Sequence, residues 1–199
     1  MKKTGMPGIV LFAAAMVSLP LCAVEMKLEN DKDVANGAAR VPKVWNPGGI
    51  DGRWLPVGQP NKYNRNDKVV IRFPLAAFIA KGKVEKAVLR LRLSTDKRNT
   101  RKEELVLEHF TTDRRELTSQ TLISQEVEEV GSLASLAAGQ NVQAEIDVTA
   151  AVNKDISKGY VYVTFRVTSL TAEKFGAPEN VKINCASINK KSIILDVTP

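Results

Sequence analysis

The sequence has few of the residues from which catalytic and metal sites are most often built. Its 199 residues include two cysteines and one histidine, His109, and aromatic residues make up 6% of the chain. Two cysteines exclude a disulfide scaffold and a four-thiolate zinc site. One histidine excludes a histidine-rich metal site within a single chain. The 44% of hydrophobic residues is ordinary for a folded protein, and the length indicates one domain.

The first 23 residues have the pattern of a secretory signal peptide. Two lysines near the start precede an apolar run at residues 9–17, and Pro20 ends this run before Leu21-Cys22-Ala23. The run is shorter than the ~20 residues that span a bilayer. We predict cleavage after Ala23 and secretion of residues 24–199 as one domain to the outside of the cell.

Lipid attachment at Cys22 is an alternative, but the bulky Leu21 before it disfavours this outcome, and a periplasmic location is also less favoured. Cleavage after Ala23 removes two lysines and no acids, so the net charge falls from +7 to +5. Cys185 is then the remaining cysteine, and one cysteine cannot form an internal disulfide. Because Cys185 lies in an alternating run, we expect a small buried residue rather than a nucleophile.

Apolar and polar residues alternate with a period of two through most of the remaining sequence. The alternation is clearest at residues 161–167 and recurs at 69–73, 87–93, 142–148 and 193–197. It is typical of antiparallel strands with one buried face and one face in water. Weaker patterns at 105–110 and 123–130 predict further strands.

Helical patterns are few. Residues 75–80, ended by Gly82, and residues 149–158, ended by Gly159, each predict one or two short helical turns, the second capped by Asp147 or Thr149. Strands do not alternate with helices, which disfavours a parallel α/β fold. The sequence therefore predicts an all-β fold, a single jelly-roll β-sandwich.

Several motifs, taken in order, resemble a known family. The front half contains Arg53–Gly58 (RWLPVG), Val70–Leu75 (VIRFPL) and Ala87–Leu91 (AVLRL), and the back half contains Ile146–Val152 (IDVTAAV). From about Asp33 to Val197 the chain resembles the DNRLRE domain, which is also classified as carbohydrate-binding module family 96. The resemblance implies a secreted jelly-roll domain that binds polysaccharide, including acidic glycans such as alginate in some members, and it implies no catalysis.

Arginine and aromatic residues at outward strand positions are the candidates for binding such a ligand. Arginine pairs bidentately with carboxylates, and aromatic rings stack on the faces of sugar rings. Six candidates are expected to share one sheet face: Arg72, Arg90, Arg92, Tyr160, Tyr162 and Arg166. Two more are expected in or beside a loop, Trp54 and Tyr63, with Trp54 turned outward because Leu55 and Val57 face inward. An ordinary solvated face is the alternative for each of them.

Enzymatic and metal chemistry have weaker support. Glu145 and Asp147 lie on one strand face at ~7 Å, a spacing that suits an inverting glycosidase, but a solvated face and a helix cap explain them better. A polysaccharide lyase would need a partner for His109, and the sequence identifies none. We expect no enzyme activity and no cofactor. A structural calcium ion at residues 30–33 or 64–67 is an alternative that no ligand-spacing rule supports.

These observations favour one function over two others. Nucleic acid is not the expected partner, because the chain is predicted to be exported and contains no recognition motif. The leading hypothesis is a secreted, non-catalytic carbohydrate-binding module for acidic polysaccharide. A structural or adhesive protein of an extracellular surface is the second hypothesis, and a polysaccharide lyase or hydrolase is the third.

Overall fold

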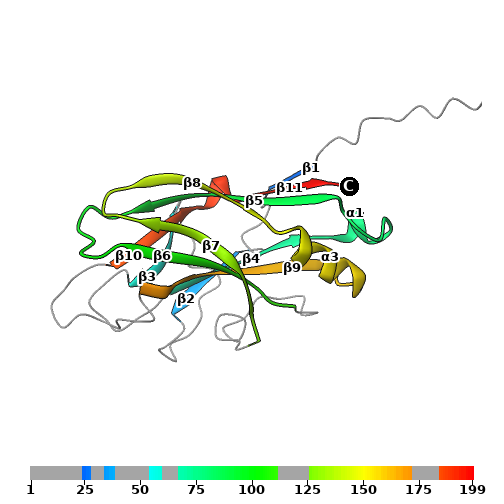
Figure 1. Cartoon of the computed structure of the whole chain (residues 1–199), viewed down its shortest axis with the longest axis horizontal. Coiled ribbons are helices and arrows are strands. Elements are labelled where there is room, and N and C mark those ends of the chain that lie inside the picture. Colours follow the sequence, from blue (N-terminus) through cyan, green and yellow to red (C-terminus); the bar gives the residue numbers. More distant parts are fainter. Residues whose placement is uncertain (1–23, 28–33, 39–53, 60–66, 112–125, 172–183) are drawn as a thin grey trace, which may run out of the picture.

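The computed structural model describes residues 24–27, 34–38, 54–59, 67–111, 126–171 and 184–199. Within these residues, antiparallel strands form two sheets that face each other (Figure 1). The first sheet has the order β3 (Trp54–Gln59), β10 (Asn184–Asn189), β5 (Lys86–Thr95) and β8 (Asn141–Asp147). The second has the order β4 (Asp67–Pro74), β9 (Tyr162–Ser169), β6 (Glu103–His109) and β7 (Glu128–Leu136).

The connections between these strands define the topology. Successive strands cross from one sheet to the other, except for β6 and β7, which pair as neighbours in the second sheet. One residue pair, Gly58 with Asp67, joins β3 to β4 and makes the ladder continuous from sheet to sheet. This is the strand order of a jelly roll. The all-β sandwich predicted from the alternating residues is therefore confirmed.

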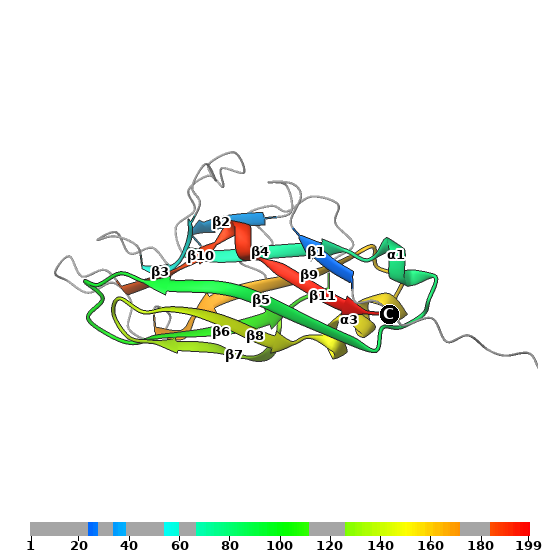
Figure 2. The same cartoon turned by 90° about the horizontal axis from the view of Figure 1, so that it is seen from above.

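Three further strands extend the two sheets. The chain leaves β10 through a 3-10 turn, η2 (Lys190–Ser192), and enters β11 (Ile194–Thr198), which pairs with the same edge of β5 that β10 uses. On the other side of β11 lies β1 (Val24–Lys27), and β2 (Val34–Ala38) pairs with β4. Figure 2 shows β11 and β1 side by side beyond the end of β10.

Two short helices lie at the end of the sandwich where β11 ends (Figure 1). These are α1 (Ala76–Ile79), between β4 and β5, and α3 (Thr149–Ser157), between β8 and β9. The Oδ1 atom of Asp147 accepts the backbone N–H of Thr149 at 2.9 Å. Gly159 follows α3 with φ +71°, a conformation that favours glycine. The predicted helical segments and the terminating glycine are confirmed. Asp147 accepts the N–H of the first residue of α3, but the N-cap position itself is occupied by Val148, which makes no side-chain cap hydrogen bond.

The core lies between the two sheets and is built from alternate residues of each strand. Leu89, Leu91 and Leu93 of β5 face Ile71 and Phe73 of β4, and all five are fully buried. Each such side chain stabilises the fold by about 1.5–3 kcal/mol through removal of apolar surface from water. On β3, Leu55 and Val57 are buried whereas Trp54 is partly exposed, as the alternation predicts.

The outward face of the second sheet differs from the expectation of a wetted face. Five of its polar side chains, all on β4 and β9, are at most 8% exposed: Lys68, Arg72, Thr164, Arg166 and Thr168. Glu104 of β6 is exposed. The expectation is therefore wrong for most of β4 and β9. Alternation tells which side chains share a face, but it does not tell whether that face is covered.

The strand predicted at 123–130 is also only partly correct. β7 begins at Glu128 and continues to Leu136, while residues 123–125 lie outside the described part of the chain. The pairing of β6 with β7 shifts register between Leu105 and Val106 and again between Leu107 and Glu108. Such bulges interrupt the period of two, so the alternation in β7 is lost.

Candidate binding surface

The predicted binding residues lie on both sheets, so the expectation of one shared face is wrong. Arg90 and Arg92 belong to β5 and Trp54 to β3, in the first sheet. Arg72 belongs to β4 and the pair Tyr162 and Arg166 to β9, in the second sheet.

Neither of the two remaining candidates belongs to the described part of either sheet. Tyr160 lies in the turn that follows α3, where its backbone N–H donates to the carbonyl oxygen of Asp155 at 3.0 Å. Tyr63 lies outside the described residues.

The outward face of the first sheet carries a row of small polar and apolar side chains. Pro56, Ser187, Ser94 and Asn141 are successive register partners across β3, β10, β5 and β8, and all four are partly or fully exposed. With ~4.8 Å between neighbouring strands, this row is about 14 Å long. Trp54 precedes Pro56 by two positions, so it projects from the same side of the sheet.

Arg92 precedes Ser94 by two positions and so faces the same way. Its side chain is exposed, and its Nε atom donates to Oδ1 of Asn141 at 3.1 Å. Its backbone N–H donates to Oγ of Ser192 at 3.2 Å. Because Asn141 is neutral, this contact orients the guanidinium group without neutralising its charge.

Arg90 differs from Arg92 in this respect. Its Nη2 atom lies 2.5 Å from Oδ2 of Asp196 on β11, and its register partner on β8 is Glu145. The charge of Arg90 is therefore matched by acids of the same face. We name the surface made by Trp54, Arg92 and the adjacent row of four side chains the β3–β8 face.

The acids of β8 have the structural roles expected of them. Glu145 is exposed and accepts a hydrogen bond from Nε2 of Gln143 at 3.0 Å. Hydrogen bonds from Thr149 lower the pKa of Asp147, which accepts the first N–H of α3. A solvated strand face and a helix cap therefore account for this pair of carboxylates.

The candidates of the second sheet lie together but are largely buried. The guanidinium carbon of Arg72 lies 4.4 Å from the ring centroid of Tyr162, a cation–π contact. Nε of Arg166 and the hydroxyl of Thr168 donate to Oε2 of Glu108 at 2.6 and 2.7 Å. Burial raises the pKa of Glu108, but these hydrogen bonds together with the positive charges of Arg166 and Lys68 hold the pKa below its usual value.

Sequence reasoning missed the partner of the single histidine. The Nε2 atom of His109 lies 2.9 Å from Oδ2 of Asp155 in α3, and the two side chains are 2% and 1% exposed. Thr111 donates its hydroxyl to the other carboxylate oxygen at 3.3 Å. One pattern could have indicated this contact: Asp155 lies on the buried face of α3, beside Val152 and Ile156. At this depth neither side chain can reach a polymeric substrate.

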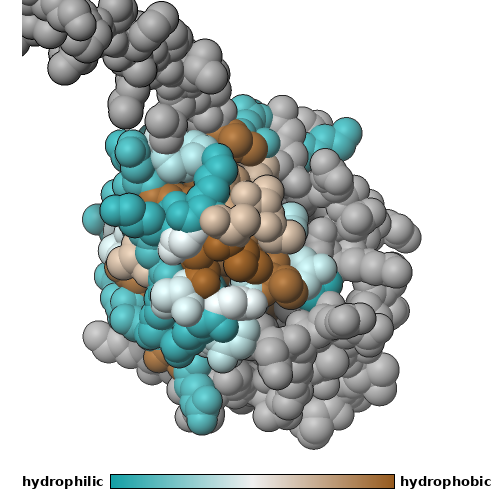
Figure 3. Space-filling view, turned by 90° about the vertical axis from the view of Figure 1, so that its right-hand side faces the viewer, coloured by the Kyte–Doolittle hydropathy of each residue, from teal (hydrophilic) through white to brown (hydrophobic). Residues whose placement is uncertain are grey.

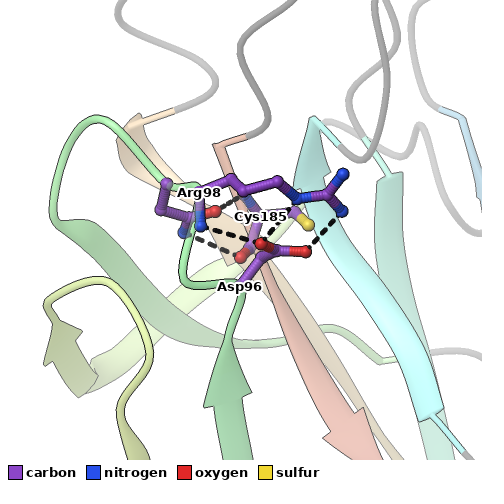
Figure 4. Close-up of polar contacts among 4 residues, drawn as sticks. Asp96, Arg98 and Cys185 are labelled. Atoms are coloured by element: carbon purple, nitrogen blue, oxygen red, sulfur yellow. Dashed lines mark hydrogen bonds and ion pairs between the residues drawn. The ribbon is translucent and has the colours of Figure 1, made fainter.

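Cys185 lies beneath the connection between β5 and β6 (Figure 4). The Nδ2 atom of Asn99 donates to the carbonyl oxygen of Cys185 at 2.9 Å, and the N–H of Cys185 donates to Oδ1 of Asn99 at 3.4 Å. Burial raises the pKa of the Cys185 thiol to about 12. A thiol with this pKa is not a nucleophile at neutral pH, so the expectation of a small buried residue is confirmed.

The connection between β5 and β6, residues 96–102, contains four lysines and arginines and an acid that pairs with one of them. Nη2 of Arg98 lies 2.7 Å from Oδ2 of Asp96, and Nε of Arg98 lies 2.9 Å from Oδ1 (Figure 4). Hydrogen bonds from Arg98 lower the pKa of Asp96 to about 2. The turn is therefore less basic than its four lysines and arginines suggest.

The described part of the chain contains no cluster of side chains that could hold a metal ion. Within it, no three side chains of histidine, cysteine, aspartate or glutamate come together as ligands. The calcium alternative at residues 30–33 lies outside this part, as do Asn64 and Asn66, whereas Asp67 is a fully buried residue of β4. Across the described ranges no helix is long and apolar enough to cross a membrane.

Comparisons with known proteins add only similarity of structure. No protein-family model matches the sequence, and no curated protein matches it significantly. The K1 cleaved adhesin domain of Lys-gingipain from Porphyromonas gingivalis W83 is similar, with 9% identity and a TM-score of 0.37 over 88% of this chain and 97% of that chain.

The second similar structure contains the CBM22-1 and GH10 modules of Clostridium thermocellum endo-1,4-β-D-xylanase 10B in complex with xylohexaose. It has 9% identity and a TM-score of 0.35 over 85% of this chain and 27% of that chain. The chain thus spans about a quarter of the xylanase chain. At these TM-scores neither similarity identifies a function.

Proposed function

We propose that this protein is an exported, non-catalytic carbohydrate-binding module that binds polysaccharide on the β3–β8 face. One observation carries the proposal. An aromatic side chain, Trp54, and an exposed cation, Arg92, project from the same side of one sheet, each two residues before a member of the row formed by Pro56, Ser187, Ser94 and Asn141. The resemblance of the sequence to the DNRLRE domain supports the same function.

The chemistry of this face suits an extended, partly anionic glycan. The ring of Trp54 can stack on the C–H face of one sugar. Hydroxyl and amide groups of Ser187, Ser94 and Asn141 can exchange hydrogen bonds with sugar hydroxyls. The guanidinium of Arg92 can donate a bidentate pair of hydrogen bonds to a uronate carboxylate. Acidic polysaccharide is therefore the proposed ligand, and binding involves no covalent change.

The candidate arginines differ in how accessible their charges are to a ligand. Arg92 is oriented by a neutral amide, whereas Arg90 is already paired with Asp196. Arg72 and Arg166 are at most 5% exposed. Among the arginines predicted from the sequence, we therefore assign the carboxylate contact to Arg92.

The test is retention of the purified protein on immobilised alginate and on a neutral β-glucan across a salt series. Arg92→Gln should weaken binding to alginate by about tenfold or more, because a charge-assisted hydrogen bond is lost, and should leave binding to the neutral polymer unchanged. Trp54→Ala should weaken both by about tenfold. Wild-type retention on alginate should fall as salt increases.

Lys83→Gln is the matched control, because it removes one exposed positive charge at the opposite end of the sandwich. It should leave binding to both polymers unchanged. Two results would overturn the proposal: a folded protein that is retained by no polymer, or a loss of binding in Lys83→Gln equal to that in Arg92→Gln.

A further inference from the structure

The end of the sandwich that carries α1 and α3 is a surface separate from the β3–β8 face. The connection between α1 and β5 is tied to α3, because the N–H of Val84 donates to Oδ1 of Asn153 at 2.8 Å and Nδ2 of Asn153 donates to the carbonyl of Val84 at 3.0 Å. Val161 joins the same end, since its carbonyl oxygen accepts the N–H of Leu75 at 2.8 Å. We name this surface the helical end.

Exposed apolar side chains gather at the helical end. The described residues include three large exposed hydrophobic side chains, and two of them are here: Val161, 46% exposed, and Val24, 43% exposed. Val24 pairs with Val197 of β11, which pairs with Ala87 at the start of β5. Figure 3 shows this end as an apolar patch bordered by hydrophilic residues.

The hydrophilic residues of the helical end are mainly lysines. Four exposed lysines surround the helices and the connections that follow them: Lys81, Lys83, Lys86 and Lys158. A fifth, Lys154, lies 2.5 Å from Glu128 and is paired with it. Glu25, next to Val24, and Glu85, in the connection before β5, are exposed acids, and Asp147 accepts the first N–H of α3. The four lysines without a named partner therefore exceed these three acids by one charge.

We propose that the helical end docks on the surface of an anionic lipid bilayer. Lysines near an anionic membrane each strengthen binding by about fivefold, and exposed apolar side chains between them can enter the boundary between headgroups and acyl chains. A hydrated polysaccharide offers no apolar phase for Val161 and Val24. The combination of lysine and valine therefore fits a lipid surface better than a glycan.

The course of the chain agrees with this orientation. The expected cleavage after Ala23 would place an α-ammonium group on Val24, at this same end. With the helical end on a bilayer, the β3–β8 face lies along the side of the sandwich and remains open to a polymer. This inference goes beyond the proposed function and does not depend on it.

A fluorescent reporter at Val161 tests the proposal directly. The variant Val161→Cys is made with Cys22→Ser and labelled with an environment-sensitive dye, since the buried Cys185, with its raised pKa, reacts slowly. The probe is a vesicle of phosphatidylcholine with 30% phosphatidylglycerol. We expect a blue shift in emission that salt reverses, and no shift with the dye at exposed Ser135 on β7. Equal shifts at both positions, or no shift at Val161, would overturn the proposal.

Charge variants supply the second measurement. Lys81→Gln, Lys83→Gln and Lys158→Gln together should weaken binding to these vesicles by about a hundredfold. The matched control removes the same charge elsewhere, through Lys97→Gln, Lys102→Gln and Lys191→Gln, and should change binding little. All variants share the apolar run at residues 9–17, so any contribution of that run to vesicle binding is the same in each. The proposal is therefore judged on the difference in vesicle binding between the two triple variants. Equal losses, or a loss specific to dextran sulfate with vesicle binding intact, would contradict the lipid assignment.

Discussion

The imidazole of His109 on β6 and the carboxylate of Asp155 in α3 form a buried pair, with Nε2 and Oδ2 2.9 Å apart. The contact links α3, the helix that follows β8 of the first sheet, to β6, a central strand of the second sheet. The ring of Phe165 lies beside His109, with centroids 5.9 Å apart, and Thr111 contacts the other oxygen of the carboxylate. The pair therefore anchors α3 on the sandwich.

Removal of the carboxylate from this pair should destabilise the fold. Asp155→Ala leaves a buried imidazole nitrogen without its partner, and an unsatisfied buried polar group costs about 1–3 kcal/mol. Urea unfolding should report a loss of stability in this range. Lys154→Ala, which breaks an exposed ion pair on the same helix, is the control and should cost less than about 1 kcal/mol. Equal costs would mean that the buried pair contributes nothing specific.

Glu103 should make the fold more stable in mild acid than at neutral pH. Its side chain is fully buried, and burial raises its pKa from the ordinary value of 4.5 to about 7, against a hydrogen bond from Ser169 at 2.6 Å. Between pH 4.5 and about 7 the folded state holds a proton that the unfolded state has lost. The free energy of unfolding should therefore fall by about 3 kcal/mol as the pH rises through this window.

Glu103→Gln should abolish this fall, because the amide does not titrate. Urea unfolding at several pH values between 4 and 8 is the measurement, with the exposed neighbour Glu104→Gln as control. Glu108 acts in the opposite direction, since its lowered pKa contributes stability that is lost in acid. A pH profile unchanged by Glu103→Gln would show that Glu103 titrates normally.

The Cys185 thiol should react only when the protein unfolds. It is buried, and its pKa of about 12 leaves almost no thiolate at pH 8. In a Cys22→Ser background, labelling with a disulfide reagent should be slow in native buffer and complete in denaturant. Rapid labelling of the native protein would contradict the burial of this residue.

The side chain of Asn99 should hold the connection between β5 and β6 against β10. It hydrogen-bonds both backbone groups of Cys185, and it is 8% exposed. Asn99→Ala should cost about 1–3 kcal/mol in urea unfolding, because those backbone groups lose their partners. Asn141→Ala, at an exposed position of β8, should cost about 0.5 kcal/mol or less. Similar costs for both variants would mean that the Asn99 contact does not stabilise the connection.

The strands could be predicted from the sequence wherever one face is apolar throughout. In β5 and β9 every second residue enters the core, and the period of two marks both strands. In β7 the two register shifts remove that period, and Gly131 and Ser132 weaken the pattern further. The pattern thus fails where the backbone departs from regular pairing.

The candidate surface could be predicted only in part, because alternation assigns a side and not a neighbour. Arg72 and Arg92 both face outward, yet β4 and β5 belong to opposite sheets. The partner of His109 could not be predicted for the same reason. β6 and α3 are distant in sequence, and they come into contact only in the folded sandwich, where the chain has crossed between the two sheets. Trp54 was placed correctly because Leu55 and Val57 are close to it in sequence.

The position of β10 has a consequence for how the chain folds. In the first sheet it lies between β3 and β5, although it follows both in sequence by a long interval. β3 has no pairing partner in the first sheet until residues 184–189 have formed β10. Pairing between such distant segments is slow because the loop must close before contacts form. The first sheet therefore closes late, and we expect slow folding that begins with the local β6–β7 hairpin.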